Sequence, residues 1–199
     1  ITRTTVKNHA ACGHAHAAID GILKLQRDYG FAAGDVARID VGSYKAAVDI
    51  VAKKDPATIF EAKFSLPYCA AMALTTGSVR TAAFTDEYLT NADIASLAMK
   101  VDVRLDEGCE AAFPKQRSAN VAITLNDGRQ LEHFSPTRKG DPDDPLSDAE
   151  LEEKYLELLA PLAGDAAARN LLATLWRLDE VSDAGDLVLV ADTLESAAQ

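Results

Sequence analysis

The sequence of 199 residues has few cysteines, and the three present form no recognisable pattern. Cys12, Cys69 and Cys109 are odd in number, widely spaced and without any Cys-x-x-Cys pair. This spacing argues against a disulfide framework and against an iron–sulfur ligand set, and it favours a reducing compartment. We therefore expect a cytoplasmic protein without a cofactor. Cys69, in an alanine-rich run, is predicted to be a small buried apolar residue, whereas Cys12 is placed where it could react.

Long apolar runs are also missing, and the basic residues are fewer than the acidic ones. No run approaches the ~20 residues of a membrane span, so no membrane partner is expected. The 31 acidic against 20 basic residues give a net charge of −11, which repels nucleic acid and anionic lipid. Because salt confines surface charges to about 8 Å, this field still permits a local cationic site.

Several signature motifs are absent as well. There is no Gly-x-Gly-x-x-Gly, phosphate loop, Gly-x-Ser-x-Gly or paired zinc cysteines, so nucleotide, hydride and serine-hydrolase chemistry has no support. The length suits one domain spanning residues 1–199. The start at Ile1, without methionine or a signal-peptide apolar region, is interpreted as a cut within a longer chain.

The periodicity of apolar residues predicts an α+β fold. Strands are predicted at an opening segment (Thr2, Thr4, Val6) and at 36–41, 101–105, 120–125 and 130–134, the last two joined by the Asn126-Asp127-Gly128 turn. Helices are predicted at 15–29, 66–76, 91–99, 147–159 and 165–178, with a mixed element at 183–194. We expect a small, largely antiparallel sheet with helices on one face, beginning with a strand–helix–strand unit.

The segment from Lys7 to Asp20 is the richest in groups that bind anions or move protons. It holds Lys7, His9, Cys12, His14 and His16 where a loop meets a helix N-terminus, which itself favours a carboxylate. His-x-His can also open a zinc site, but no third ligand has a suitable spacing, so no metal is expected. The alternatives are substrate binding or proton transfer, histidines that cap or pack the helix start, and a lysine that only faces solvent. Gly13 would let the backbone approach a ligand closely.

Two further segments could contribute polar groups. Tyr44 follows the strand 36–41 and precedes Lys45, so this pair could hydrogen-bond a carboxylate or supply a proton, or the tyrosine could simply pack. In the run 60–71, Lys63 and Ser65 could bind an anion at a helix start, although close packing is the favoured interpretation. The run 139–154 is a turn-rich connector with an expected structural role.

The segments 7–20, 60–71 and 139–154 together resemble the C-terminal part of the MmgE/PrpD family, which includes 2-methylcitrate dehydratase and cis-aconitate decarboxylase. The resemblance extends from Ile1 to about Leu159, with Asn8-His9-Ala10 where many relatives have a proline and an aromatic residue. It implies that Lys7 faces a carboxylated substrate and that the position of Tyr44 looks into the site. It also implies a homodimer and an N-terminal helical domain, which this sequence does not contain, with the active site between the two parts.

The resulting hypothesis is a hydro-lyase domain of propionate metabolism that acts on a small tricarboxylate such as 2-methylcitrate and contributes half of an active site. The predicted catalytic residues are Lys7, His14, His16 and Tyr44, and the predicted substrate-binding residues are Lys7, Gly13, Lys45 and Lys63. Decarboxylation or epimerisation of a related acid is one alternative, because all three reactions pass through a carbanion-like species. A non-catalytic lid or dimerisation domain is the other, and the isolated domain is expected to be inactive.

A shared site makes one demand on the topology. The loop 7–16 and the strand exit 42–45 must be neighbours. We expect the opening strand to lie parallel to the strand 36–41, with helix 15–29 as the crossover. The four catalytic candidates would then form a cationic rim.

Overall fold

The computed structural model describes residues 4–183, 185 and 187. The chain divides into two compact units, residues 1–145 and 146–199, and each is described by itself. The prediction of one domain over 1–199 stays a prediction. Within the described residues, no helix has both the length and the apolar character needed to cross a bilayer.

The first unit is built on a mixed four-stranded sheet with the strand order β2-β1-β3-β4. Its strands are β1 (Val36–Ser43), β2 (Val101–Leu105), β3 (Ala119–Leu125) and β4 (Gln130–Ser135). β1 pairs in parallel with β2, whereas the β1–β3 and β3–β4 pairs are antiparallel. The predicted α+β class and the hairpin at 126–128 are therefore confirmed, in a sheet with one parallel pair.

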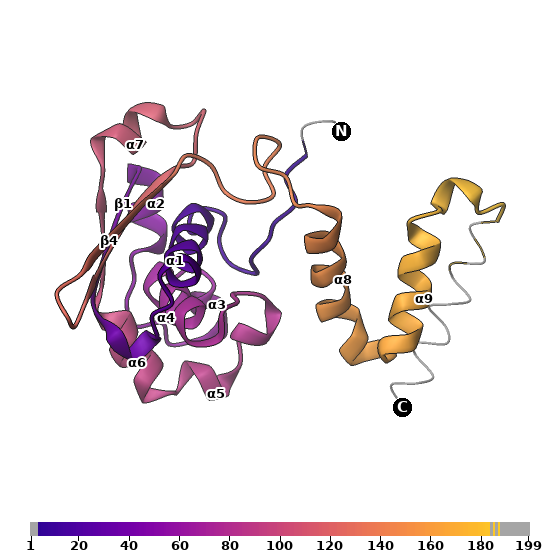
Figure 1. The fold of residues 1–199 in the computed structure, drawn as a ribbon, viewed down its shortest axis with the longest axis horizontal. Helices are drawn as coiled ribbons and strands as arrows, with labels where there is room; N and C mark the ends of the chain where they lie inside the picture. The colour runs from indigo at the N-terminus through magenta and orange to yellow at the C-terminus, as the bar shows by residue number, and fades with distance from the viewer. Residues whose placement is uncertain (1–3, 184, 186, 188–199) are drawn as a thin grey trace. The chain divides into compact units, whose positions relative to one another are not determined.

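The sheet has one buried and one open face because its strands alternate apolar and polar residues. Ile39 and Val41 of β1 are buried together with Val121 and Ile123 of β3. α1 and α4 lie over this buried face (Figure 1). The intervening positions, such as Asp40 and Asn120, face the other side.

The helices of the first unit lie before β1, between β1 and β2, and after β2. They are α1 (His16–Tyr29), α2 (Lys45–Val51), α3 (Ile59–Ala62), α4 (Leu66–Thr76), α5 (Asp86–Leu89), α6 (Ala92–Met99) and α7 (Glu107–Ala112). Short 3₁₀ turns occur at Ala33–Asp35 and Thr81–Ala83. The predicted helices at 15–29, 66–76 and 91–99 are thus present.

α1 lies directly on the sheet because a glycine stands at the point of contact. A Cβ at Gly21 would be 3.1 Å from both Ser135 Oγ and Val121 Cγ2, which is tighter than ordinary packing. Ile19 and Ile22 flank this position and are fully buried. The close approach fixes the N-terminal end of α1, and with it the histidine-rich loop, relative to β3 and β4.

The prediction that the chain opens with a strand–helix–strand unit is wrong. Residues 4–7 form no strand; Val6 N–H donates a single backbone hydrogen bond of 2.9 Å to Gly140 O, and Thr2 lies outside the described residues. Both edges of β1 are already occupied, by β2 and β3. The parallel neighbour of β1 is therefore β2, reached through a long crossover that contains α2 to α6.

The second unit contains the helices α8 (Asp148–Ala163) and α9 (Asp165–Leu175), followed by a 3₁₀ turn at Leu178–Glu180. Ser147 and Glu150 form the predicted capping box at the start of α8. α9 ends three residues before the predicted boundary. The mixed element predicted at 183–194 falls almost entirely outside the described residues.

Candidate active site

His14 and Tyr44 form the centre of the candidate site. The His14 Nδ1 atom and the Tyr44 hydroxyl are 2.7 Å apart, and the two rings meet edge to face at a centroid distance of 5.5 Å. Tyr44 is 1% exposed, whereas His14 is partly exposed. The pair therefore has a buried phenol behind an accessible imidazole.

Tyr44 is held from behind by an aromatic stack. It ends the extended segment after β1 and occupies the N-cap position of α2. Its ring stacks on Phe113, with centroids 4.4 Å apart and an interplanar angle of 12°. Such stacking fixes the ring plane, so the hydroxyl is directed at His14.

The loop that carries His14 is tied to the helical layer by backbone hydrogen bonds. Cys12 N–H donates to Lys63 O at 2.7 Å, and Ala10 N–H donates to Val79 O at 2.9 Å. Ala15 N–H closes the turn onto Cys12 O at 2.9 Å. The run around Lys63 thus supports the loop through its main chain.

Burial and positive charge set the protonation of the pair. Burial lowers the pKa of His14, and the Arg117 and Arg138 cations lower it further. Burial raises the pKa of Tyr44 to about 12, against the opposing effect of the same two arginines. At neutral pH the site therefore holds a neutral imidazole and a protonated phenol, which are a base and an acid in hydrogen-bond contact.

Lys7 and Arg138 flank Gly13 beside this pair. A Cβ built on Gly13 would lie 2.6 Å from Arg138 Nη1 and 3.9 Å from Lys7 Cε. Arg138 Nη1 donates to Gly13 O at 3.5 Å, and Lys7 Nζ donates to Ala11 O at 3.2 Å. The space that glycine leaves open at this position is therefore occupied by the guanidinium group.

His16 lies in the core behind the loop. It is 1% exposed, and its Nε2 donates to Ala11 O at 3.2 Å. Burial and the neighbouring His9 lower its pKa to about 4, so the ring is neutral. His9 is buried as well and pairs through Nε2 with Asp20 Oδ1 at 2.8 Å. These contacts match the packing alternative for His16, and we assign it no reaction step.

The structure does not bring Lys45 and Lys63 to the pair. Lys45 follows Tyr44 in the chain, but its ammonium group binds Asp49 on α2 at 2.6 Å. Lys63 Nζ lies 5.6 Å from the centre of the Phe84 ring. Of the four predicted catalytic residues, the structure gathers Lys7, His14 and Tyr44, although not through the expected topology.

Arg138 and Arg117 were missed by sequence reasoning. Arg138 immediately precedes the connector 139–154, to which we gave only a structural role. The signal that could have found it is Asp141, three residues later, which can orient an arginine side chain. Arg117 lies in a loop without a motif, and only the fold shows its proximity.

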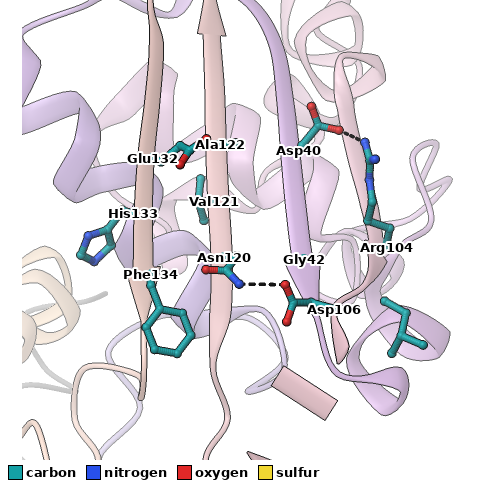
Figure 2. A pocket seen from close by; sticks show the side chains of 11 residues that line it. Asp40, Gly42, Arg104, Asp106, Asn120, Val121, Ala122, Glu132, His133 and Phe134 are labelled. Atoms are coloured by element: carbon teal, nitrogen blue, oxygen red, sulfur yellow. Dashed lines mark hydrogen bonds and ion pairs between the residues drawn. The ribbon is translucent and has the colours of Figure 1, made fainter. Parts of the chain in front are cut away.

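A hollow of about 450 Å³ on the open face of the sheet is a different feature. Asp40 of β1 pairs with Arg104 of β2, and Asn120 of β3 donates to Asp106, the N-cap residue of α7, at 2.8 Å. Figure 2 shows both contacts. Asp40 is also bound by Arg38 at 2.7 Å. Because the lining holds three carboxylates, Asp40, Asp106 and Glu132, against the single arginine Arg104, the hollow has a weaker case for binding an anion than the His14–Tyr44 region. Among the described residues, no group of three histidines, cysteines or carboxylates could hold a metal ion.

The fold and the site define an α+β domain with an acid–base pair flanked by cations at the end of its sheet. The family model for the MmgE/PrpD C-terminal domain matches residues 9–180 of the sequence, and the chain belongs to this family. No curated protein matches the chain. The MmgE/PrpD family is known for dehydratases, so the chain is a domain of a dehydratase family.

Proposed function

We propose that this chain is the C-terminal domain of a hydro-lyase that removes water from a small tricarboxylate such as 2-methylcitrate. The observation that carries the proposal is the 2.7 Å contact between His14 Nδ1 and the Tyr44 hydroxyl, with Lys7 and Arg138 beside it. Dehydration needs a base for the C–H proton, an acid for the departing hydroxide and cations for the carboxylates. His14 supplies the base, Tyr44 the acid, and Lys7 and Arg138 the cations.

In the proposed reaction, Lys7 binds the carboxylate next to the carbon that loses its proton. His14 takes that proton, and a carbon–carbon double bond forms as the carbon–oxygen bond on the neighbouring atom breaks. The Tyr44 hydroxyl protonates the departing hydroxide to give water. His14 takes the proton at Nε2, because its Nδ1 is the atom hydrogen-bonded to Tyr44. The Nδ1 proton of the resulting imidazolium then passes to the phenolate through the shared hydrogen bond, which leaves a neutral imidazole and a protonated phenol.

The test is Lys7→Ala in the full-length protein, with dehydration of a tricarboxylate panel followed by NMR. We expect kcat/KM to fall about 100-fold, in the range of lost charge-assisted hydrogen bonds. Lys24→Ala, which removes an exposed lysine paired with Asp28 at 2.7 Å, serves as the control. An unchanged rate of the Lys7 variant on every acid would refute the assignment.

Decarboxylation or epimerisation of a related acid is the second candidate activity. Both reactions use the same base and cations, because each passes through charge developing beside a carboxylate. The same NMR panel separates them, since it records loss of water, loss of carbon dioxide or inversion. Carbon dioxide release without water would replace the dehydratase proposal.

The intact enzyme is proposed to be a cytoplasmic homodimer in which an N-terminal helical domain completes the active site. A purely supporting role for this domain, as a lid or dimerisation unit, predicts a different result. In that case the isolated domain would bind no citrate by calorimetry but would restore activity when mixed with the helical half. We expect the isolated domain to bind citrate weakly without turning it over.

A further inference from the structure

Arg138 is held by an acidic partner on its own turn. Its Nε donates to both carboxylate oxygens of Asp141 at 3.0 Å, and an Nη atom lies 3.0 Å from Oδ1. The two side chains are only 11% and 14% exposed. The edge of the guanidinium formed by Nε and one Nη is therefore occupied by Asp141, and the orientation of the whole group is fixed.

Asp141 is in turn fixed by two hydroxyl groups. Thr5 Oγ1 donates to Oδ1 at 2.7 Å, and Thr137 Oγ1 donates to Oδ2 at 3.1 Å. Arg138 and these donors hold the pKa of Asp141 low against the effect of burial. The carboxylate therefore stays charged and keeps the arginine in place.

The segment 138–141 is anchored to α1 and to the stretch of chain that precedes the histidine-rich loop. Asp20 Oδ2 accepts from Lys139 N–H at 2.8 Å while its other oxygen binds His9. Val6 N–H binds Gly140 O. These contacts bring Arg138 to the same glycine that Lys7 touches, so the two cations lie side by side next to His14.

Resting on the proposed function, we infer that Arg138 is a specificity residue that binds a second carboxylate of the substrate. Lys7 binds the carboxylate at the reacting carbon, which every candidate acid has. Arg138, oriented by Asp141, presents its Nη1 edge to a carboxylate further along the molecule. The site thus selects acids with an additional carboxylate, and Gly13 is required because any side chain there would displace the guanidinium.

Calorimetry on the full-length protein tests this inference with citrate and malate, which differ by one carboxymethyl group. We expect the unaltered protein to bind citrate more tightly, and Arg138→Gln to weaken citrate binding about 30-fold while malate binding changes less than threefold. Gly13→Ala should show the same selective loss. Lys7→Ala should weaken both acids equally. Arg129→Gln, an exposed arginine paired with Asp127 at 2.8 Å, is the matched control and should change neither.

The outcomes separate the two proposals. Equal weakening of both acids by Arg138→Gln would mean a structural role and would overturn the inference, as would unchanged citrate binding or no preference in the unaltered protein. Selective loss without any release of water would refute the dehydratase proposal and leave the assignment of Arg138 intact. Dehydration that depends on Lys7 but not on Arg138 would support the dehydratase proposal and overturn the assignment of Arg138.

Discussion

Tyr44 is buried although its hydroxyl belongs to the candidate active site, and this combination explains its environment. The ring is held by the stack on Phe113, while the single polar atom reaches His14. A phenol whose pKa is raised to about 12 keeps its proton throughout the physiological range. It is therefore suited to donate a proton in the reaction rather than to act as the resting base.

Tyr44→Phe should separate this chemical role from packing. The stack remains, so we expect the melting temperature to change little, while kcat for dehydration falls about 100-fold, the lower range of a lost acid–base group. Steady-state kinetics by NMR would measure both parameters. Tyr29→Phe, at the exposed end of α1, is the control. A kcat within twofold of the unaltered enzyme would contradict the proposed role of Tyr44.

His16 predicts a pH dependence of stability. Its pKa is about 4 in the folded protein against 6.5 in a free side chain, because of burial and His9, with Ala11 O and Asp20 acting in the opposite direction. Because the pKa is lower in the folded state, the unfolded state binds a proton at His16 at a higher pH than the folded state does. Stability is therefore lost as pH falls from 6.5 towards 4, by about 3 kcal/mol for this one group.

Urea unfolding at pH 7.0 and pH 4.5 would measure this effect in the unaltered protein and in His16→Gln. The glutamine can still donate to Ala11 O but cannot take up a proton. We expect the variant to lose clearly less stability between the two pH values. Equal losses would show that groups other than His16 carry the acid sensitivity.

At the scale of secondary structure, local signals predicted the well-defined elements. α4 begins at the Ser65 cap with Pro67 in its first turn and ends at Gly77, and the capping box of α8 is present. The strands and the Asn-Asp-Gly hairpin follow from alternation and turn chemistry. The short helices α2, α3, α5 and α7 were missed, since four to seven residues give too little periodicity.

Pairing between distant strands was the part that the sequence could not show. Three alternating residues at the start of the chain predicted a strand beside β1. A segment can pair with a given strand only where that strand has an unpaired edge. β1 is covered on both edges. Likewise, the His14–Tyr44 proximity was anticipated from two loops, whereas Arg138 and Arg117 reach the site only through long-range packing.

The run around Ser65 illustrates an architectural element that resembles a binding motif. Ser65 is fully buried; its hydroxyl accepts from Tyr68 N–H at 3.1 Å and donates to Lys53 O at 2.5 Å. Ser65→Ala leaves both groups unpaired, and we expect a loss of about 2 kcal/mol in unfolding free energy. KM for the substrate should not change.

Thr85→Ala provides the comparison for Ser65→Ala. Thr85 caps the short helix α5 by accepting from Tyr88 N–H at 3.3 Å, and its side chain is exposed. Its loss should therefore destabilise the protein less. A Ser65 variant of normal stability but with a raised KM would instead favour anion binding at the start of α4.

For the whole molecule, the net charge of −11 and the cationic site are compatible because they act over different distances. The surface charges are screened within about 8 Å at physiological salt. Lys7 and Arg138, by contrast, both lie against Gly13. The acidic surface therefore disfavours polyanions, which contact a wide area, while a small carboxylate meets mainly the local cations.

The division into two units leads to a prediction about which part of the chain folds alone. The sheet, the helices that cover it and every residue proposed for the site lie within 1–145. The second unit has two main helices in its described part, and several of their large apolar side chains are exposed, among them Leu162 and Trp176. A pair of helices of this size buries too little apolar surface to be stable by itself.

We therefore expect a fragment of residues 1–145 to unfold cooperatively and to keep the citrate affinity of the isolated 199-residue chain within about threefold, a difference of less than 1 kcal/mol. A fragment of residues 146–199 should show little helix by circular dichroism. Thermal melts and calorimetry on both fragments would check this. If the fragment 1–145 melted without cooperativity, its core would depend on the second unit, and the boundary at Pro145 would not mark an independent folding unit.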